Sequence, residues 1–287
     1  MPTTSADTAI LGVLQDPSAW QFVGTLLPPE VAPVDDPRRA AWSATHTHRH
    51  PYREVMVALT GTGAYAHTGR AHPCRPGTVF LFDVQEEHDS GYPEFSPPME
   101  HLWITVAPEQ YFARRHRAGT PRGSMPSSGT VTLPQTAGEG CLNACWSALR
   151  QTPNLPPAIV RGRLTGCLAL LLARVAESLL APPSQDRLST QRDAVDAVRR
   201  HLRQTAGSGD SLETLARFAG YSKFHFLRLF QRHTGQSLQE YIDACRERRM
   251  TELARQGYSK KDIAFELGFS CPSAFSRWRR NHGFTDA

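Results

Sequence analysis

The first half of the chain contains short hydrophobic runs that are separated by glycine and proline. Three of these runs begin or end at a turn signal such as Gly61-Thr62-Gly63 or Pro76-Gly77: residues 55–59, 79–82 and 101–106. Short apolar runs bounded by such residues are typical of β-strands. We therefore predict an all-β barrel or sandwich over about residues 44–106, whereas residues 1–45 show little periodic signal.

The hydrophobic pattern becomes helical after Pro134. In one segment apolar residues fall at i, i+3, i+4 and i+7, at Leu142, Cys145, Trp146 and Leu149. A longer helical pattern runs from Ile159 to Leu180, and its apolar stripe is too wide for a helix in water. Packing within the domain and contact with a second copy of the chain explain this stripe equally well. The stripe comprises Leu164, Leu168, Leu171, Leu172, Val175 and Leu179.

The segment Ala181-Pro-Pro-Ser-Gln-Asp186 interrupts the helical pattern and marks a domain boundary. We place the linker at about residues 182–191, between a first domain at residues 1–184 and a second domain at residues 192–287. From residue 192 onward every pattern is helical, so the second domain is predicted to be all-α.

The second domain contains an internal repeat. Leu215-Ala216-x-x-x-Gly220-Tyr221-Ser222 recurs 48 residues later as Ile263-Ala264-x-x-x-Gly268-Phe269-Ser270. In each copy the small Ala allows close helix packing, the Gly ends a helix because it tolerates a positive φ, and the Ser is a candidate cap for the following helix. Ser211 is a candidate N-cap for the first helix of the first copy. A short helix, a tight turn and a second helix make a helix-turn-helix unit.

The second helix of each unit, at about residues 223–233 and 272–282, has one apolar face for the core. This face comprises Phe226, Leu229, Phe230 and His233 in the first helix, and Phe275 and Trp278 in the second. Other side chains are free to face DNA: Lys223, Phe224, Leu227, Arg228 and Gln231 in the first helix, and Ser273, Ser276, Arg277 and Arg280 in the second. A helical bundle with solvated charges is the alternative, which two units with matching caps make much weaker.

The spacing and the charge of this domain both suit DNA. Residues 239–256 predict one long connecting helix, and a helix of that length spans about 27 Å, enough to hold two recognition helices roughly one DNA turn apart. Residues 187–287 carry 18 Lys and Arg against 11 Asp and Glu, whereas residues 1–186 carry 14 against 16. A basic module beside a near-neutral one indicates an anionic partner, most commonly DNA.

Residues 192–283 resemble the AraC/XylS family of bacterial transcription regulators. The matching text is Ser211–Ser222, Arg228–Gly235, Leu238, Tyr241, Arg246, Asp262–Phe269 and Ser273–Arg277. The resemblance implies base-reading positions at Phe224, Leu227 and Arg228 in the first helix, and at Ser273, Ala274, Ser276 and Arg277 in the second. The family usually carries Phe where this chain has Arg279, so we expect a weaker DNA contact from the second unit.

The first domain resembles the cupin-type sensor domain of the same family. His48-Arg-His50-Pro-Tyr-Arg-Glu54 followed by Gly61 is similar to the first cupin motif, and Pro76-Gly77 followed by His88 is similar to the second. The resemblance implies a cupin-like β-barrel with helices. The whole chain is therefore predicted to be α+β, with a C-terminal all-α domain of two helix-turn-helix units joined by a long helix.

His48, His50, Glu54 and His88 are the candidate ligand-binding residues of the barrel. Two His separated by one residue on a strand point to the same face. Three imidazoles and a carboxylate are a suitable ligand set for zinc, iron, nickel or manganese. The competing interpretation is a small-molecule pocket or barrel framework without metal, because histidine is frequent here, as at His46, His67, His72 and His101. We favour the pocket, with a divalent metal as the alternative and no other cofactor expected.

These features predict a transcription regulator controlled by a small molecule, and not an enzyme. A cupin metalloenzyme fused to a DNA-binding tail is the alternative, and an architectural DNA binder is the third hypothesis; the paired recognition helices favour the regulator. The expected partners are double-stranded DNA, an effector for which the resemblance implies a sugar or other small metabolite, RNA polymerase and a second copy of the chain. Activation is one expected mode.

The chain shows neither a signal peptide nor a segment long and apolar enough to span a bilayer. We therefore expect a cytoplasmic protein without a membrane partner. The six cysteines are scattered and include no CxxC pair: Cys74, Cys141, Cys145, Cys167, Cys245 and Cys271. Buried or half-buried thiols are expected rather than a disulfide framework.

Overall fold

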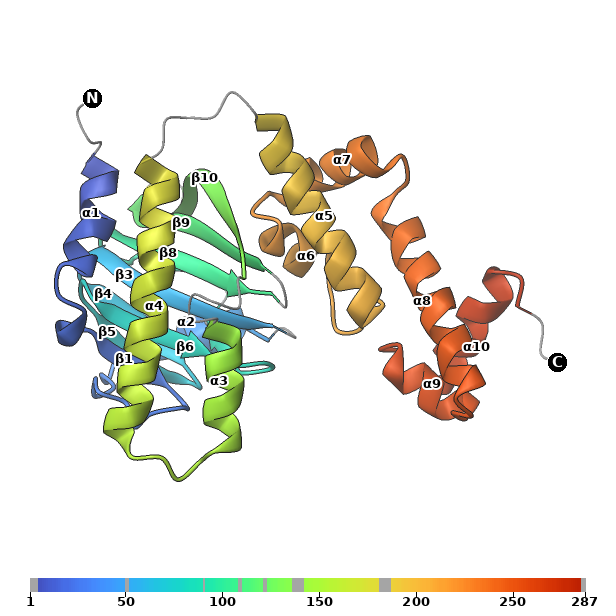
Figure 1. Ribbon diagram of the computed structural model, residues 1–287, viewed down its shortest axis with the longest axis horizontal. Coiled ribbons are helices and arrows are strands. Elements are labelled where there is room, and N and C mark those ends of the chain that lie inside the picture. The colour runs from blue at the N-terminus through green and yellow to red at the C-terminus, as the bar shows by residue number, and fades with distance from the viewer. Residues whose placement is uncertain are drawn as a thin grey trace. The chain divides into compact units, whose positions relative to one another are not determined.

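A computed structural model describes residues 5–49, 52–89, 91–107, 110–120, 123–135, 142–180 and 187–284 of the chain. The chain separates into two compact units, Met1–Gln185 and Asp186–Ala287. Figure 1 shows strands and helices in the first unit, and the described part of the second unit is helical. Of the residues singled out above, His50 and Cys141 lie outside the described residues.

The described strands of the first unit form two sheets. The six-stranded sheet has the order β1-β6-β3-β8-β9-β10, and the four-stranded sheet has the order β2-β7-β4-β5. Neighbouring strands are antiparallel except for β1 and β6. The strands are β1 (Gln21–Gly24), β2 (Thr47–His48), β3 (Arg53–Gly61), β4 (Gly63–His67), β5 (Arg70–Cys74), β6 (Thr78–Phe82), β7 (His88–Asp89), β8 (Met99–Val106), β9 (Gln110–Thr120) and β10 (Gly123–Pro134).

One face of the six-stranded sheet is covered by helices α1 (Ser5–Leu14) and α4 (Pro157–Leu180), which lie side by side in Figure 1. Helix α3 (Leu142–Gln151) packs against α4. The predicted apolar stripe of α4 belongs to this core: Leu164, Leu168, Leu171, Leu172 and Val175 are buried and Leu179 is half-buried. Packing within the unit therefore explains the stripe, and its buried residues do not face a second copy.

The space between the two sheets is rich in aromatic side chains. Tyr65 of β4 lies 5.7 Å from Phe80, 6.0 Å from Phe82 and 5.4 Å from Trp103, measured between ring centroids. These residues are buried and belong to one core cluster. The interior of this sheet unit is thus lined by rings that come from both sheets.

The first unit also contains elements that the hydrophobic pattern does not predict. Helix α2 (Pro37–His46) occupies the region expected to be irregular, and the side chain of Asp36 caps it by accepting a hydrogen bond from the Arg39 amide at 2.9 Å. A short 3₁₀ helix, η1 (Pro17–Ala19), follows α1. The strands continue well beyond Val106 into β9 and β10, so the predicted β region ends too early.

The second unit consists of six described helices: α5 (Arg187–Thr205), α6 (Leu212–Phe218), α7 (Lys223–Thr234), α8 (Leu238–Arg255), α9 (Lys260–Glu266) and α10 (Pro272–Asn281). Helix α5 begins at Arg187, so the expected linker to residue 191 is too long, and residues 187–191 belong to the helix. The two helix-turn-helix units and the long helix α8 between them confirm the predicted arrangement. None of the described helices combines the length and the hydrophobicity that crossing a membrane requires.

Candidate nucleic-acid interface and candidate effector site

The first helix-turn-helix unit is α6, a tight turn and α7. Ser211 caps α6 as predicted, because its Oγ accepts a hydrogen bond from the Thr214 amide at 3.0 Å. Gly220 ends α6 with φ of 78°, and the amide of Tyr221 then donates to the carbonyl of Ala216 at 2.9 Å. A residue with a side chain would be strained at this φ, which is why the repeat has Gly here.

The second helix-turn-helix unit, formed by α9 and α10, repeats this turn. Gly268 has φ of 80°, and the amide of Phe269 donates to the carbonyl of Ala264 at 3.0 Å. The cap of the second helix differs from the prediction, because Cys271 rather than Ser270 holds the N-cap position of α10. Pro272 supplies the first helical residue, so the helix begins one residue later than the repeat indicates.

Helix α7 has the two predicted faces. Phe226, Leu229 and Phe230 are buried, and His233 is half-buried at the end of that stripe. The opposite side carries the candidate base-reading residues: Phe224 is 74% exposed, Arg228 is exposed, and Lys223 and Leu227 are half-buried. Lys223 Nζ lies 2.6 Å from Glu213 Oε1 of α6, so this lysine is held across the turn. A face with an exposed Phe and Arg can meet base edges through both apolar and hydrogen-bonding contacts.

Helix α10 presents a similar face. Phe275 and Trp278 are buried as predicted, and Arg279 stacks over the Phe275 ring at 5.9 Å. The candidate base-reading residues Ser273, Ser276 and Arg277 are exposed, and Ala274 is half-buried. Arg279 stands where the resembled family has Phe, and its guanidinium lies over the ring of Phe275 while α10 keeps its helical fold.

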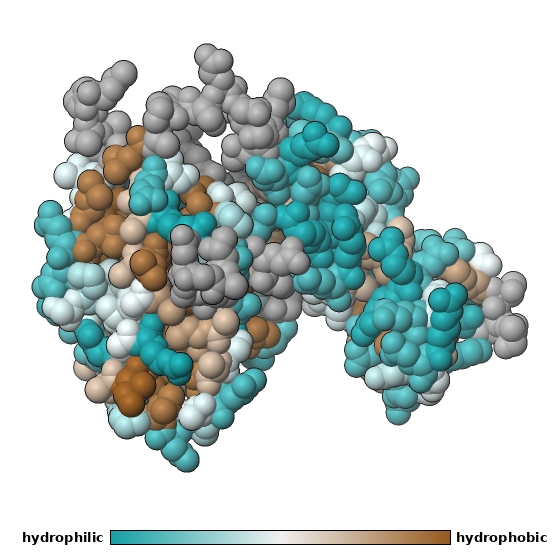
Figure 2. Space-filling model, in the orientation of Figure 1, coloured by the Kyte–Doolittle hydropathy of each residue, from teal (hydrophilic) through white to brown (hydrophobic). Residues whose placement is uncertain are grey.

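Helix α8 holds the two units together. It starts at a capping box in which Ser237 accepts from the Glu240 amide and Glu240 accepts from the Ser237 amide. Near its middle, Asp243 accepts a hydrogen bond from Trp278 Nε1 of α10 at 2.8 Å. An ordered helix of 18 residues spans about 27 Å and keeps α7 and α10 at a set separation. Most of the face of the C-terminal helical part, residues 187–284, that is seen in Figure 2 is hydrophilic, as a nucleic-acid-binding surface requires.

In the first unit, three of the four predicted ligand-binding residues are described, and the structure brings them together. His48 and His88 are register partners on β2 and β7, with ring centroids 4.4 Å apart. Glu54 of β3 is buried, and its Oε2 lies 3.7 Å from His88 Nε2. Nδ1 of His88 lies 3.0 Å from the Glu86 carbonyl oxygen, which can only accept, so Nδ1 carries a proton and Nε2 faces Glu54.

Two residues that the sequence did not single out complete this cluster. Arg114 of β9 contacts Glu54 Oε1 at 3.3 Å, and the hydroxyl of Thr105 on β8 donates to the same oxygen at 2.9 Å. A guanidinium beside the carboxylate disfavours a second cation at this position. Among the described residues no group of three His, Cys, Asp or Glu is arranged to hold a metal ion. His50, the fourth predicted ligand, lies outside the described residues.

A second polar cluster lies against the same aromatic rings. The indole of Trp103 donates to Tyr92 Oη at 2.8 Å, and an indole can only donate. Tyr92 Oη lies 2.6 Å from His101 Nδ1 and 3.7 Å from Met56 Sδ. Burial lowers the pKa of His101 to about 3, which keeps the ring neutral at pH 7. His101 Nε2 is buried and has no hydrogen-bond partner among the residues that the structure describes.

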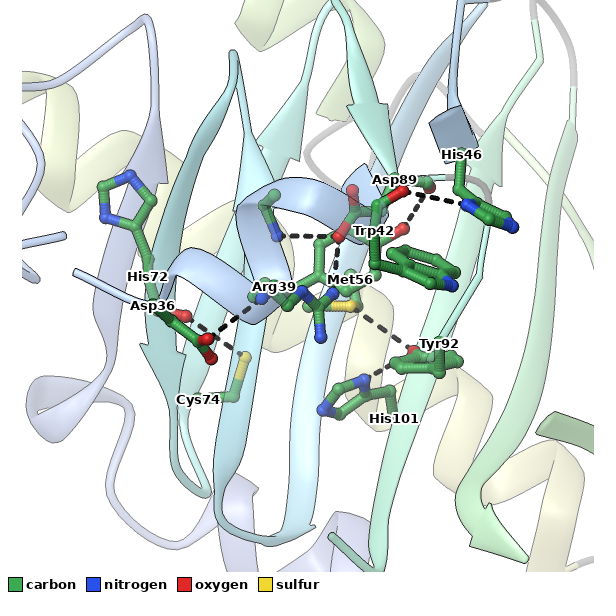
Figure 3. A network of polar contacts seen from close by, with 12 residues as sticks. Asp36, Arg39, Trp42, His46, Met56, His72, Cys74, Asp89, Tyr92 and His101 are labelled. Atoms are coloured by element: carbon green, nitrogen blue, oxygen red, sulfur yellow. Dashed lines mark hydrogen bonds and ion pairs between the residues drawn. The ribbon is translucent and has the colours of Figure 1, made fainter. Parts of the chain in front are cut away.

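Arg39 approaches this cluster from α2. Its guanidinium pairs with Asp89 of β7, and both side chains are buried. Asp89 also accepts from the Ala66 amide at 3.2 Å, and its carbonyl accepts from Tyr65 Oη. Figure 3 shows the guanidinium of Arg39 and the ring of His101 turned toward the same part of the interior, close to Met56 and Cys74. The Asp36-Pro37 pair, a helix-start signal, is the one local feature that predicts α2 and hence the place of Arg39.

Comparison with known proteins identifies both units. A model described as "AraC-like ligand binding domain" matches residues 38–162, and one described as "Helix-turn-helix domain" matches residues 215–283. Probable transcription factor PqrA of Proteus vulgaris is 37% identical over 78 residues, which are 26% of this chain and 62% of PqrA, so less than two thirds of that relative is covered. An uncharacterized HTH-type transcriptional regulator of Bacillus subtilis (strain 168), YfiF, is 24% identical over 245 residues, 79% of this chain and 72% of YfiF.

A comparison with solved structures finds ToxT from Vibrio cholerae O395. The alignment covers 81% of this chain and 86% of ToxT with 10% identity and a TM-score of 0.25, which is too low to support an argument. The matched families and sequence relatives are regulators of transcription and not enzymes.

Proposed function

Because the chain belongs to the AraC/XylS family of transcription regulators, we propose that it binds specific DNA sequences and regulates transcription in response to a small molecule. The observation that carries the proposal is the repeated turn. Two units share the same positive-φ glycine and the same backbone hydrogen bond, and each holds a helix with an exposed polar face. Such a protein acts on promoter DNA in the cytoplasm, where it meets RNA polymerase, and activation is one mode of action.

In this proposal α7 and α10 enter successive major grooves on one side of the duplex. Arg228 and Arg277 donate to guanine edges, and Phe224 packs against thymine methyl groups. The helices α6 and α9 support them from behind, and α8 sets the distance between the two contacts. Direct reading of bases by both helices predicts two half-sites about one helical turn apart.

Selection of genomic DNA fragments on the purified full-length protein tests this function. We expect enrichment of fragments that share two conserved blocks with centres about 10 bp apart. Measured binding to an enriched fragment should weaken steeply with salt, because Lys and Arg release counterions from phosphates. Equal recovery of all fragments would reject sequence-specific binding and leave an architectural binder.

We also propose that the effector binds in the aromatic interior of the sheet unit. Glu54, His88 and Arg114 form one buried polar cluster, and Arg39, Asp89 and His101 belong to a second. Burying charged and polar groups costs free energy unless they are paired or used by a ligand. Hydrogen-bonding groups beside aromatic faces suit a polyhydroxylated molecule such as a sugar. We favour this pocket over a metal, because the Glu54 carboxylate is already in contact with the Arg114 guanidinium and the Thr105 hydroxyl.

A panel of sugars and other small metabolites, tested for thermal stabilisation of the full-length protein, examines the effector proposal. Glu54→Gln keeps the shape of the side chain and its contact with Thr105, but it removes the charge beside Arg114. We expect this variant to fold and to lose the stabilisation that an active compound gives to the unaltered protein. An effector that stabilises both proteins equally would lie elsewhere.

Self-association is a further part of the proposal, through the outward face of α4. Ile159, Leu170 and Leu180 are 49%, 51% and 42% exposed, and they fall on the side of the helix opposite to the buried stripe. Figure 2 shows apolar residues on the face of the first unit that carries α1 and α4. Leu170→Glu places a charge on this surface, so sedimentation should show a dimer in the unaltered protein and a monomer in the variant. A monomer in both would reject the interface.

A further inference from the structure

Cys145 and Cys167 lie on facing helices, α3 and α4, which pack against each other. Both thiols are half-buried and pack against the same core cluster. Each cysteine follows one buried leucine by three residues and precedes another by four, which places it at the edge of the buried stripe of its helix. These leucines are Leu142 and Leu149 on α3, and Leu164 and Leu171 on α4. The helix positions therefore direct both thiols toward the α3–α4 seam.

The two thiols interact across this seam. The side chains of Cys145 and Cys167 are hydrogen-bonded, which places the two thiols within hydrogen-bonding reach of each other. Arg163 lies one turn before Cys167 on α4 and adds a positive charge beside Cys145. The hydrogen bond and this charge stabilise the thiolate against the opposing effect of burial, so the pKa of Cys145 falls to about 7. These contacts favour the thiolate, which is the nucleophilic form of a cysteine.

The other described cysteines differ from this pair. Burial raises the pKa of Cys74 to about 12, and burial also raises the pKa of Cys245. Cys271 has a lowered pKa through its contact with Ser273, but no second cysteine contacts it among the residues that the structure describes. Within the described residues, only Cys145 and Cys167 therefore combine an accessible thiolate with a second thiol in contact.

We propose that Cys145 and Cys167 form a hydroperoxide-reactive pair that closes a disulfide between α3 and α4. The Cys145 thiolate attacks one oxygen of the hydroperoxide, the O–O bond breaks, and Cys145 becomes a sulfenic acid while the other oxygen leaves with a proton as alcohol or water. The Cys167 thiol then attacks the sulfenic sulfur, the S–S bond forms, and water leaves. Two thiols are oxidised and one hydroperoxide is reduced. This covalent site is independent of the proposed DNA contacts.

Oxidation of the full-length protein tests the proposal. Hydrogen peroxide is added in increasing amounts at pH 7, remaining thiols are alkylated, and the protein is digested without reductant for mass spectrometry. We expect one linked peptide pair, about 2 Da lighter than the two free-thiol peptides, before any other cysteine reacts. Fragment ions must place the bond on Cys145, because Cys141 lies on the same tryptic peptide.

Variants separate the two steps. Cys167→Ser should stop the reaction at a Cys145 sulfenic acid that a dimedone probe traps, and Cys145→Ser should abolish fast oxidation of Cys167. Cys74→Ser is the matched control and should form the linkage at the unaltered rate. A linkage through Cys141, a stable sulfinic acid on Cys145 of the unaltered protein, or loss of the Cys74 thiol as fast as the Cys145 thiol would overturn the proposal.

Discussion

The side chain of Phe224 offers the sharpest test of how α7 is used. It is 74% exposed on the first recognition helix, whereas Phe226, two residues later, is fully buried. A solvent-exposed Phe contributes little to folding, and Ala favours a helix more than Phe does. We therefore expect Phe224→Ala to leave the free energy of unfolding nearly unchanged and to weaken DNA binding.

The size of the loss follows from the exposed area. A Phe side chain buries about 200 Å², so a 74% exposed ring has about 150 Å² left to cover. At about 25 cal/mol per Å², covering half of that area against DNA contributes about 2 kcal/mol. A loss of about 2 kcal/mol corresponds to roughly a 30-fold increase in Kd.

Fluorescence anisotropy with a selected DNA site measures the Kd, and urea unfolding measures stability. Phe226→Ala is the matched control, since it removes a buried ring from the other face of the same helix and should cost about 3–5 kcal/mol of stability. The two variants should thus separate affinity from stability. If Phe224→Ala binds the selected site as tightly as the unaltered protein does, the exposed face of α7 is not the DNA-reading face.

Three further outcomes are expected. Arg228→Ala should cost about 1–3 kcal/mol on the selected site and relax the base preference at one position, and Arg277→Ala should cost less; equal losses in anisotropy titrations would contradict the weaker role of α10. The pKa of His101 is about 3, whereas an unperturbed His has a pKa of 6.5, so between these values the unfolded chain binds a proton that the folded chain does not. The free energy of unfolding therefore falls as pH is lowered through that window, by up to about 1.4 kcal/mol per pH unit. His101→Gln should remove that share of the slope, which urea unfolding at pH 5 and 7 measures, and identical slopes would refute it. Elemental analysis of the untagged protein should find less than about a tenth of an equivalent of any transition metal, unaffected by His50→Ala; one bound metal per chain would restore the metal hypothesis.

The helix-turn-helix units could be predicted from sequence because their geometry is local. Gly220 and Gly268 each adopt a positive φ, and each turn is closed by a hydrogen bond between residues five apart in the chain. The information for such a turn lies within a few consecutive residues. The Ser caps of the second helices were predicted less well: Ser222 holds the N-cap position of α7 without a side-chain hydrogen bond, and Pro272 starts α10, which moves its N-cap position from Ser270 to Cys271.

The stripe on α4 shows what periodicity leaves open. A period of 3.6 residues tells that one face of a helix is covered, but it does not tell by what. Helix α4 packs against β10 of the six-stranded sheet and against α1, which lies more than 100 residues earlier in the chain, and Leu164 and Leu168 belong to this core. The outward residues Ile159 and Leu170 lie next to buried apolar residues in the sequence, so periodicity does not separate the exposed apolar positions from the covered ones.

The candidate effector site was predicted only in part, because some of its residues lie in local sequence motifs and others are brought in by sheet pairing. The resemblance to the cupin motifs indicated Glu54 and His88, yet their partners Arg114 and Thr105 come from β9 and β8, 60 and 51 residues from Glu54. Sheet pairing brings these side chains together, and the chain between them carries no signal of it. This difference changes the chemistry of the site: a carboxylate beside two imidazoles suggests a metal, whereas the same carboxylate paired with a guanidinium and a hydroxyl suits a ligand that forms hydrogen bonds. Identifying the effector therefore depends on groups that only the folded sheet assembles, while the DNA-reading residues follow from the repeat itself.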